Sequence, residues 1–496
     1  MTNNNGLGHT LVVPSGVEID LRFMTSAELH TTATSIADVL AWLSEHRARN
    51  SAELERVSLF ELDNWRVHPG TGNVAHDSGR FFTIEGVRVQ TDYGLVPRWA
   101  QPIINQPEIG ILGLLVREQD GIMQCLVQAK MEPGNIGSVQ ISPTVQATRS
   151  NYTRVHRGAA TNYLEYFQNP RDVIADVLQS EQGARFLRKR NRNMIVEVGG
   201  NVPVVDGYRW VSLAQLYELL KLDNVVNMDL RSVLSSVSLV SEASGRRTAS
   251  TGTPPKEAMP GTSSWARSIF QPERSLHTYA EVLSWLTNAK TLFDLRVDRI
   301  PLNEAEHWRM KDGAIGHEDG QFFSVIGVGV TSADREVAGW TQPMIATEHE
   351  GLIAFLVKSI NDIPHFLCHS RVEAGNFDIV EISPTVQCIT RNYRNLPVDK
   401  QPKYLQAVLN APARNVLYSA YQSEEGGRFY RQQNRYMIVR VDDDFPVTPQ
   451  DDYIWLSLGQ LQHFIRYANH INVEARSLVA CLSATYRNDL TDPVLS

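Results

Sequence analysis

Apolar residues recur along this chain with two different periods, which predicts that it combines helices with strands. Residues 35–46 carry an apolar side chain at every third or fourth position, the spacing of an amphipathic helix. Short strands are expected around residues 81–89. An apolar strand over 111–116 and a second over 124–130 flank Gly121, which predicts a hairpin.

Farther along, the pattern becomes mainly helical. Residues 139–148 still alternate like a strand, and Pro143 within them predicts a sheet edge or a bulge. Helices are then expected over 163–167, 173–186 and 213–220. Strands followed by helices indicate an α+β fold, with helices packed on a mixed or antiparallel sheet.

The chain contains an internal duplication. Residues 81–152 align without a gap to residues 322–393, and 27 of these 72 positions are identical, where unrelated sequences would share about 5. The repeated unit is far longer than a solenoid repeat, so the chain holds two copies of one domain. The best-preserved segments are Glu132-Pro-Gly-Asn135 with Glu373-Ala-Gly-Asn376, Ile141-Ser-Pro-Thr-Val-Gln146 with Ile382-Ser-Pro-Thr-Val-Gln387, and Gln179-Ser-Glu-Gln-Gly183 with Gln422-Ser-Glu-Glu-Gly426.

Matches outside this block extend the two copies to residues 25–240 and 271–485. Either copy is long enough to bury a core of its own. Residues 241–270 between them are small, polar and rich in proline, which predicts a flexible linker. Residues 1–24 are expected to form a polar tail and lead-in, and residues 486–496 a C-terminal tail.

Composition excludes several classes of protein. A formal net charge of −8 argues against a general nucleic-acid binder. No apolar run approaches membrane-spanning length and no signal-peptide pattern opens the chain, so no membrane association is expected. The four cysteines lie far apart at positions that are not equivalent in the copies, which favours reduced thiols in the cytoplasm over disulfides or zinc. They are Cys125, Cys368, Cys388 and Cys481.

A first candidate site lies at the end of a predicted strand. Gln128, Lys130 and Glu132 share one face of that strand because side chains alternate with a period of two. An amide, an ammonium and a carboxylate would form a polar pocket wall there, although a solvent-exposed strand has the same pattern. The second copy keeps a base and an acid at Arg371 and Glu373, which favours the functional interpretation.

A second candidate segment, residues 144–153, is rich in groups that hydrogen-bond phosphates and sugars. Arg149 offers a planar donor fork suited to a diphosphate, and neighbouring hydroxyl and amide groups add smaller donors. The alternative is a polar loop that caps a helix. In the second copy the arginine has moved by one position, to Arg391, and has not been lost.

Two pairs of tryptophans are candidates for stacking on a planar base. Trp65 and Trp308 each precede a glycine-rich loop that ends in a histidine, and Trp99 and Trp340 each begin a Trp-x-Gln-Pro segment. Core packing is the alternative for all four.

Motifs for the common cofactors are missing from the sequence. It contains no Gly-x-Gly-x-x-Gly after a strand, no Walker loop, no His-Glu-x-x-His, no Cys-x-x-Cys and no Gly-x-Ser-x-Gly. The sequence therefore does not call for a dinucleotide, a nucleoside triphosphate, zinc or an acyl-enzyme, and no cofactor is expected.

Four runs of residues carry a specific resemblance. They are Lys130-Met-Glu-Pro-Gly-Asn135, Ser142-Pro-Thr-Val-Gln-Ala-Thr-Arg-Ser-Asn-Tyr152, Gln179-Ser-Glu-Gln-Gly183 and Lys189-Arg-Asn-Arg-Asn-Met194. With them the chain resembles the NDP-hexose 2,3-dehydratases, which serve the biosynthesis of deoxysugars for bacterial natural products. The similarity covers nearly the whole chain except the linker, and it includes the duplication.

The resemblance implies a cytoplasmic, homodimeric enzyme with two Nudix-like domains per subunit, acting on dTDP-4-keto-6-deoxy-D-glucose. It also implies two nucleotide-sugar pockets per chain, one of them catalytic. A Nudix hydrolase holds Mg²⁺ with the pattern G-x5-E-x7-R-E-U-x-E-E-x-G-U, where U is aliphatic. The nearest segments, residues 177–183 and 420–427, both lack the upstream Arg-Glu. A hard cation needs several oxygen ligands, so no metal is expected in either copy.

A 2,3-dehydration needs no redox cofactor, because electrons move only within the substrate. The C4 ketone acidifies the hydrogen at C3, and a base removes it. Donors then stabilise the enolate at O4, and an acid assists departure of the C2 hydroxyl. The resulting enol tautomerises to a 3,4-diketo-2,6-dideoxy sugar.

We favour the first copy as the catalytic pocket. Lys130 can transfer a proton whereas Arg371 effectively cannot, and His156 has no histidine counterpart in the second copy. His369, which replaces a glutamine of the first copy, is the titratable group that argues for the second.

Within the first pocket, Glu132 or His156 would be the base, and Lys130 or Tyr152 the donor to O4 or to the leaving hydroxyl. The expected substrate-binding residues are Trp65, Trp99, Gln128, Asn135, Thr144, Arg149, Ser150, Asn151, Tyr152, Thr153 and Ser180. Those of the second pocket are Trp308, Trp340, Arg371, Glu373, Asn376, Arg391, Asn392, Tyr393 and Ser423.

Two other functions stay open at the level of sequence. One is a nucleotide-sugar diphosphate hydrolase, which would release thymidine monophosphate with Mg²⁺. The other is a non-catalytic tandem module that binds a nucleotide sugar and leaves it unchanged.

Overall fold

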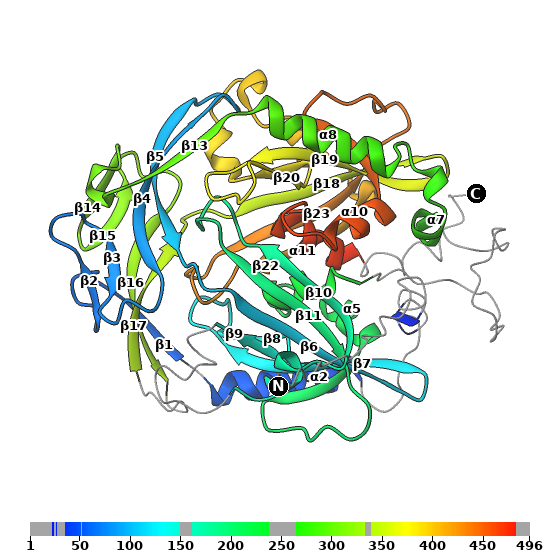
Figure 1. Cartoon of the computed structure of the whole chain (residues 1–496), viewed down its shortest axis with the longest axis horizontal. Coiled ribbons are helices and arrows are strands. Elements are labelled where there is room, and N and C mark those ends of the chain that lie inside the picture. Colours follow the sequence, from blue (N-terminus) through cyan, green and yellow to red (C-terminus); the bar gives the residue numbers. More distant parts are fainter. Residues whose placement is uncertain are drawn as a thin grey trace, which may run out of the picture.

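The computed structural model describes residues 22–23, 26, 35–50, 52–148, 161–237, 264–332 and 339–482. Most of these residues lie in sheets, and the order of elements in the first half is repeated in the second (Figure 1). The predicted α+β class is confirmed.

In the first half the elements are α2 (Ile36–Arg49), β1 (Ala52–Val57), β2 (Trp65–Val67), β3 (Val74–His76), β4 (Thr83–Thr91), β5 (Arg98–Asn105), β6 (Gly110–Gln119), β7 (Ile122–Met131), β8 (Val139–Ser142), β9 (Val145–Ala147), α4 (Glu165–Gln168), β10 (Asp172–Ser180), β11 (Arg190–Glu197), β12 (Tyr208–Ser212), α5 (Leu213–Leu219) and α6 (Met228–Leu234).

In the second half they are α7 (Ser264–Phe270), η1 (Pro272–Arg274), α8 (Tyr279–Leu292), β13 (Leu295–Ile300), η2 (Leu302–Glu304), β14 (Trp308–Lys311), β15 (Ala314–His317), β16 (Ser324–Ser332), β17 (Gly339–Ala346), β18 (Gly351–Ile360), β19 (Ile363–Val372), β20 (Val380–Ser383), β21 (Val386–Cys388), η3 (Thr390–Tyr393), η4 (Val398–Lys400), α9 (Leu405–Leu409), η5 (Ala413–Asn415), β22 (Val416–Ser423), β23 (Gln433–Arg440), β24 (Tyr453–Ser457), α10 (Leu458–Ile465) and α11 (Val473–Leu482).

Each half contributes one seven-stranded mixed sheet. In the first half the strand order is β10-β11-β6-β7-β12, with β8 beside β7 and β9 beside β6. Strands β11 and β6 run parallel, and their neighbours in the sheet are antiparallel. The second half repeats this arrangement as β22-β23-β18-β19-β24, with β20 beside β19 and β21 beside β18.

Two five-stranded sheets are shared between the halves. Strand β1 of the first half pairs antiparallel with β16 of the second, with Val57 opposite Gly327. Strand β13 of the second half pairs in the same way with β4 of the first, with Ile300 opposite Gly86. The halves therefore exchange one strand each, and the two shared sheets lie together on the left of Figure 1.

The largest cluster of buried apolar side chains also spans both halves. Helices α6 and α11 pack against each other between the two large sheets. From these helices the buried Arg231 donates to the carbonyl oxygen of Ser423 at 2.8 Å, and Arg476 donates to that of Ser180 at 2.6 Å. The two copies thus form one packed unit.

Several predicted elements are confirmed, with local reasons visible in the structure. Helix α2 begins after Ser35, whose hydroxyl accepts the Asp38 N–H while the Asp38 carboxylate accepts the Ser35 N–H, a capping box. The hairpin of β6 and β7 turns through Asp120 and Gly121, both with positive φ, as a two-residue type I′ turn requires. The helix expected over 213–220 is α5.

Pro143 interrupts the strand predicted over 139–148. Strand β8 ends before it and pairs with β7, whereas β9 begins after it and pairs with β6. In the gap, the Thr144 hydroxyl donates to the carbonyl oxygen of Leu126 and accepts the N–H of Leu115. The proline therefore marks the point where the chain crosses from one strand to the next.

The helix predicted over residues 173–186 is wrong. These residues begin in β10, which pairs antiparallel with β11 and has a bulge between Val173 and Ala175. The β-branched side chains of Val173, Ile174 and Val177 fit a pleated strand better than a helix. The bulge offsets the alternation by one residue, so the apolar spacing resembles that of a helix.

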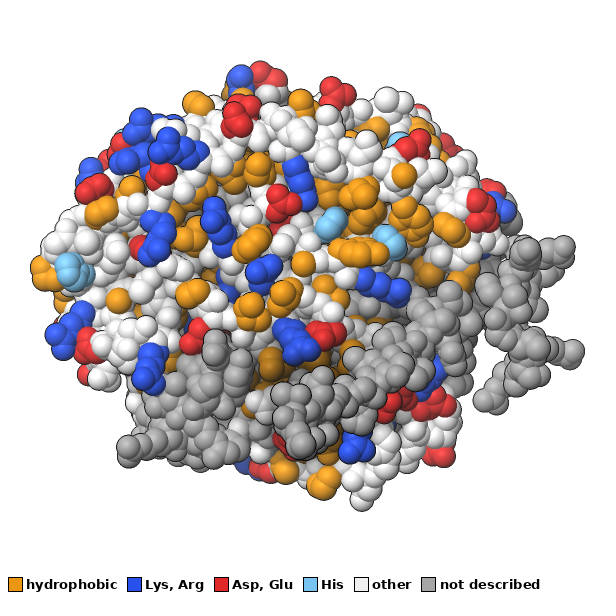
Figure 2. All heavy atoms as spheres, in the orientation of Figure 1, with side chains coloured by type: hydrophobic (Ala, Val, Ile, Leu, Met, Phe, Trp, Pro, Cys, Tyr) orange, Lys and Arg blue, Asp and Glu red, His pale blue; other side chains and the backbone are white. Residues whose placement is uncertain are grey.

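The described surface carries charges of both signs. Figure 2 shows Lys and Arg side chains interspersed with Asp and Glu over one face. None of the described helices has the length and apolar character needed to cross a bilayer. All four cysteines are free thiols. Within the described ranges, no group of three or more His, Cys, Asp or Glu is arranged to hold a metal ion.

Candidate active site

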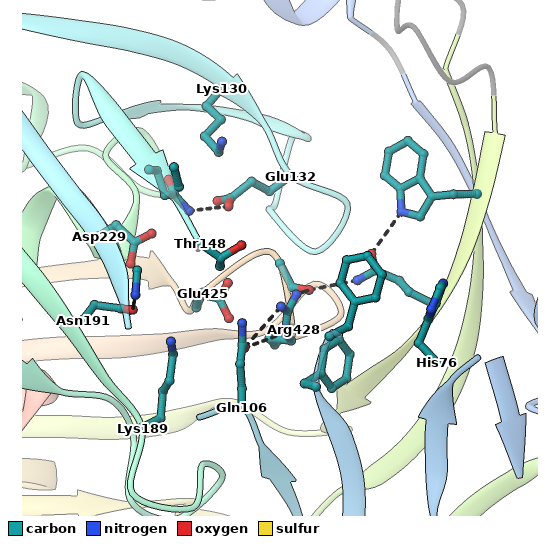
Figure 3. A pocket seen from close by; sticks show the side chains of 18 of the residues that line it. His76, Gln106, Lys130, Glu132, Thr148, Lys189, Asn191, Asp229, Glu425 and Arg428 are labelled. Atoms are coloured by element: carbon teal, nitrogen blue, oxygen red, sulfur yellow. Dashed lines mark hydrogen bonds between the residues drawn. The ribbon is translucent and has the colours of Figure 1, made fainter. Parts of the chain in front are cut away.

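A cavity of about 1340 Å³ lies between the halves, and both halves supply its walls (Figure 3). We call it the first-half cavity, because most of its lining residues belong to the first half. Its volume exceeds the roughly 300–1,000 Å³ of ordinary small-molecule sites, which leaves room for an extended ligand. The charged and polar lining residues include Gln106, Gln128, Lys130, Glu132, Gln146, Thr148, Glu181, Lys189, Asn191 and Asp229 from the first half, and Thr341, Gln342, Glu425 and Arg428 from the second.

Three predicted site residues, Gln128, Lys130 and Glu132, meet in this cavity, as the period of strand β7 requires. The Lys130 side chain points into the cavity (Figure 3). The Glu132 carboxylate accepts hydrogen bonds from Asn135 Nδ2 at 3.2 Å and from Gln146 Nε2 at 2.6 Å. Asn135, expected to bind substrate, instead fixes the orientation of this carboxylate.

Five further charged side chains line the cavity: Glu181, Lys189, Asp229, Glu425 and Arg428. Burial raises the pKa of Glu181 and that of Asp229 above their ordinary values. Burial also raises the pKa of Glu425 to about 7, against the opposing effect of Arg428. Burial lowers the pKa of Lys189 to about 8. Two groups that can exchange protons near neutral pH thus face one cavity, which is typical of catalytic sites.

One side of the cavity, where Arg428 lies, is lined by aromatic rings. Trp65, only 7% exposed, packs edge-on against His76 with ring centroids 5.2 Å apart. The Arg428 guanidinium lies 4.2 Å from the centre of the Phe82 ring, and Trp340 completes this wall from β17. In Figure 3 His76 lies on the opposite side of the view from Asp229 and Asn191, with Arg428 between them. Aromatic walls of this kind suit a planar base.

The best-preserved motifs contact each other across the halves. Gly134, of the Glu-x-Gly-Asn motif, donates its N–H to the carbonyl oxygen of Gly426 at 2.7 Å. In the mirror contact, Gly375 donates to the carbonyl oxygen of Gly183 at 2.7 Å. A Cβ on Gly134 would lie 1.7 Å from the carbonyl oxygen of Phe429, so only glycine fits there. Both motifs therefore have a structural reason to be kept in both copies.

The corresponding region of the second half is arranged differently. Arg371 Nε donates to the Glu373 carboxylate at 2.7 Å, so base and acid are paired with each other. His369 Nε2 lies 3.1 Å from the Tyr93 hydroxyl and 3.3 Å from the Asp452 carboxylate. Burial lowers the pKa of His369, which favours the neutral imidazole.

Some residues expected to bind substrate serve packing and the contact between halves. Thr144 is fully buried between β6 and β7. The Ser180 hydroxyl donates to the Glu381 carboxylate at 2.7 Å, and the Ser423 hydroxyl donates to Asn224 Oδ1 at 2.8 Å. Each serine therefore joins one half to the other.

The tryptophans are distributed differently from the expectation. Trp340, expected in the second pocket, lines the first-half cavity, whereas Trp99, expected in the first, is not among its lining residues. The reason is the strand exchange, which brings β17 of the second half against the first half. Trp308 is buried and donates its indole N–H to the carbonyl oxygen of Ala100 at 2.8 Å.

Some of the remaining predicted residues lie within the described part of the chain and the others lie outside it. Asn376 donates to the carbonyl oxygen of Arg371, as a brace within the second half. The other described ones, Arg391, Asn392 and Tyr393, belong to η3. The residues that lie outside the described part of the chain are Arg149, Ser150, Asn151, Tyr152, Thr153 and His156.

None of the five further charged lining residues was predicted as a site residue, and two of them, Lys189 and Glu425, could have been found from the sequence. A signal for both exists in the comparison of the copies. Lys189 corresponds to Gln432, and Glu425 corresponds to Gln182. Each titratable group thus has a neutral glutamine as its counterpart, an asymmetry of the kind expected where one of two copies carries the chemistry.

Comparison with known proteins gives a consistent result. The profile of the NDP-hexose 2,3-dehydratase family matches residues 36–237 and 279–482. The chain is 47% identical over 447 residues to a dTDP-4-dehydro-6-deoxy-alpha-D-glucopyranose 2,3-dehydratase from Saccharopolyspora spinosa, covering 90% of each chain. It is 43% identical over 454 residues to a protein of the same description from Amycolatopsis orientalis, again covering 90% of each chain. With a third, from Streptomyces violaceoruber, identity is 44% over 455 residues, covering 90% of this chain and 97% of the relative.

Proposed function

Because the chain belongs to the NDP-hexose 2,3-dehydratase family, we propose that it removes water from dTDP-4-keto-6-deoxy-D-glucose and forms dTDP-3,4-diketo-2,6-dideoxy-D-glucose. The observation that carries this proposal is a single cavity with a lysine and a glutamate at one strand end and aromatic rings on the other side. The thymine would stack at the aromatic wall, which leaves the sugar among the charged groups.

In this arrangement Glu132 is the base and Lys130 the electrophilic partner. The amides that hold the Glu132 carboxylate leave it fixed at the cavity wall, a condition for removing a proton from carbon in a set direction. The Lys130 ammonium faces the same space and would stabilise the negative charge that develops on O4. The roles predicted for Tyr152 as a proton donor and for His156 as a base remain predictions.

The first half is the catalytic one in this proposal. Lys130 can both donate a proton and stabilise charge, whereas Arg371 is tied to Glu373 and keeps its proton. The second half would bind a second nucleotide sugar without converting it. The groups that would contact such a ligand are the guanidinium of Arg371 and the ring of Tyr393 in η3.

We further propose that each half is a Nudix-like domain, and that the enzyme is a cofactor-independent hydro-lyase that works as a cytoplasmic homodimer. The mixed seven-stranded sheet with helices packed on it supports the first point. The others rest on the family resemblance and on the electron balance of the reaction.

The direct test is incubation with the 4-keto-6-deoxy sugar nucleotide in the presence of EDTA, followed by mass spectrometry. Loss of one water from the nucleotide sugar is expected. Release of thymidine monophosphate only when Mg²⁺ is added would instead support the hydrolase. Tight binding with an unchanged sugar would support a non-catalytic module.

A further inference from the structure

Glu425 reaches the first-half cavity from the second half. It lies in the loop between β22 and β23, which is hydrogen-bonded on two sides. The Tyr430 N–H donates to the carbonyl oxygen of Ile345 at 2.7 Å, and the carbonyl oxygen of Gly426 accepts the Gly134 N–H at 2.7 Å. A side chain on a loop held in this way has a defined position in the cavity.

One oxygen of the Glu425 carboxyl group has no hydrogen-bond partner among the described residues. This oxygen, Oε2, is buried. Leaving a buried polar atom unpaired costs free energy, so an unpaired one in a cavity wall needs a reason such as a ligand. Burial, together with the neighbouring carboxylates of Glu132 and Glu181, raises the pKa of Glu425 to about 7 although Arg428 opposes the shift.

The first copy has an amide at the position that corresponds to Glu425. Gln182, the counterpart of Glu425, donates its amide to Glu424, which also accepts hydrogen bonds from Asn434 and Tyr436. A side-chain amide neither gains nor loses a proton near neutral pH. The proton-exchanging group at this position is therefore kept only in the cavity that also contains Lys130.

We propose that Glu425 is a catalytic residue, the general acid that protonates the C2 hydroxyl as it leaves; this inference rests on the proposed function. The first-half cavity is then completed by a group from the second half. Glu132 and Glu425, one from each half, divide the work of base and acid.

The C3–H bond breaks, its proton passes to Glu132, and its electron pair forms a C3=C4 bond while O4 becomes negative beside Lys130. When the C4=O4 bond re-forms, the pair shifts into a C2=C3 bond and the C2–O bond breaks. The departing hydroxyl takes the proton of Glu425 and leaves as water. Return of one proton from Glu132 to Glu425 restores both groups.

The central variant is Glu425→Gln, which removes the proton with little change of shape. Water loss should slow by about 10²–10⁴-fold. Exchange of the substrate C3 hydrogen with D₂O should continue, because Glu132 is untouched. The matched control is Glu381→Gln. Burial raises the pKa of Glu381 to about 7 and its Oε1 is also unpaired, but it does not line the cavity and its counterpart is already Gln140. This control should keep the wild-type rate.

A second test uses the unmodified protein, so its result does not depend on whether a variant folds. A 2-deoxy-2-fluoro analogue of the substrate loses fluoride, which needs no proton to leave. The rate of water loss should fall as pH rises through the pKa of the acid, and the rate of fluoride loss should lack this fall. The same fall with both substrates would overturn the proposal.

The role of Glu425 and the dehydratase activity itself can fail separately. If the wild type releases no water from the natural substrate, the proposed function itself fails. If the wild type is active and Glu425→Gln is equally fast, only the role of Glu425 fails. The role also fails if Glu425→Gln still binds dTDP but has lost both C3 exchange and fluoride elimination, since the residue would then act before the hydroxyl leaves.

Discussion

A methyl group at Gly134 would enter the contact that joins the two halves. The Cβ of Gly134→Ala would lie 1.7 Å from the carbonyl oxygen of Phe429 and 2.7 Å from that of Gly426. Both are backbone atoms, so the loop after β22 must move. That movement stretches two hydrogen bonds, from the Gly134 N–H to Gly426 at 2.7 Å and from the Arg431 N–H to the Gly134 carbonyl at 2.8 Å.

These contacts determine how much free energy of unfolding the Gly134→Ala variant should lose. Overpacking of this kind costs about 1–3 kcal/mol, and each of the two hydrogen bonds contributes about 0.5–1.5 kcal/mol. The free energy of unfolding of Gly134→Ala should therefore fall by about 2–6 kcal/mol. Urea denaturation followed by tryptophan fluorescence measures this change.

The mirror variant Gly375→Ala is the control. Its Cβ would lie 1.7 Å from the carbonyl oxygen of Phe186 and 2.6 Å from that of Gly183, so a similar loss of stability is expected. The loop displaced by Gly134→Ala carries Glu425, whereas the other loop carries a glutamine at that position. Initial rates at a temperature where both variants are folded should therefore fall much more for Gly134→Ala.

Two results would refute this reasoning. An unchanged unfolding midpoint in both variants would mean that the loops yield without cost. Equal loss of turnover in both would mean that catalysis does not depend on the loop that carries Glu425 more than on the other loop.

Four other outcomes are expected. Lys130→Ala should lower kcat by about 10²–10⁴-fold while Arg371→Ala keeps most of the activity, and the reverse order would move catalysis to the second half. Calorimetry with dTDP should approach two sites per chain, with Trp65→Ala weakening one; a single-site isotherm under conditions that detect weak sites would contradict this. Turnover should survive EDTA, because the Nudix acidic pattern is incomplete in both copies. Burial raises the pKa of Glu425 from its usual 4.5 to about 7, so its contribution to stability is fully present below pH 4.5 and is lost as pH rises through 7. The thermal midpoint of Glu425→Gln should accordingly fall less between pH 5 and 8 than that of the wild type, and parallel curves would speak against the shift.

The sequence predicts those features that depend on neighbours along the chain. The period of two along β7 is enough to bring Gln128, Lys130 and Glu132 to one wall. The capping box at Ser35 and the turn at Gly121 are likewise local. The helix predicted over residues 173–186 was wrong because a bulged strand and a helix have similar apolar spacing. Only the pairing with β11 distinguishes the two.

The strand exchange could not be read from one sequence. In a duplicated chain, β1 has two nearly equivalent partners, β4 of its own half and β16 of the other, and apolar patterns do not distinguish them. The exchange places β17, and with it Trp340, beside the first half. That Trp340 and Glu425 line the same cavity as Lys130 is seen only in the three-dimensional arrangement, although the comparison of the copies already marks Glu425 as asymmetric.

The reciprocal exchange of β1 and β13 has an evolutionary consequence. In this chain each five-stranded sheet takes one strand from the other half, and the cavity takes Glu425 from the second half. Two identical copies about a twofold axis could supply each other in the same way. We infer that the ancestor was a short chain that assembled in pairs and had two equal sites. Separate chains split between residues 237 and 264 should then co-purify as an active pair, and recovery of either one as a stable, folded protein by itself would contradict this descent. Fusion made the pairing permanent, and the two sites could then diverge, as Lys189 and Glu425 have from Gln432 and Gln182.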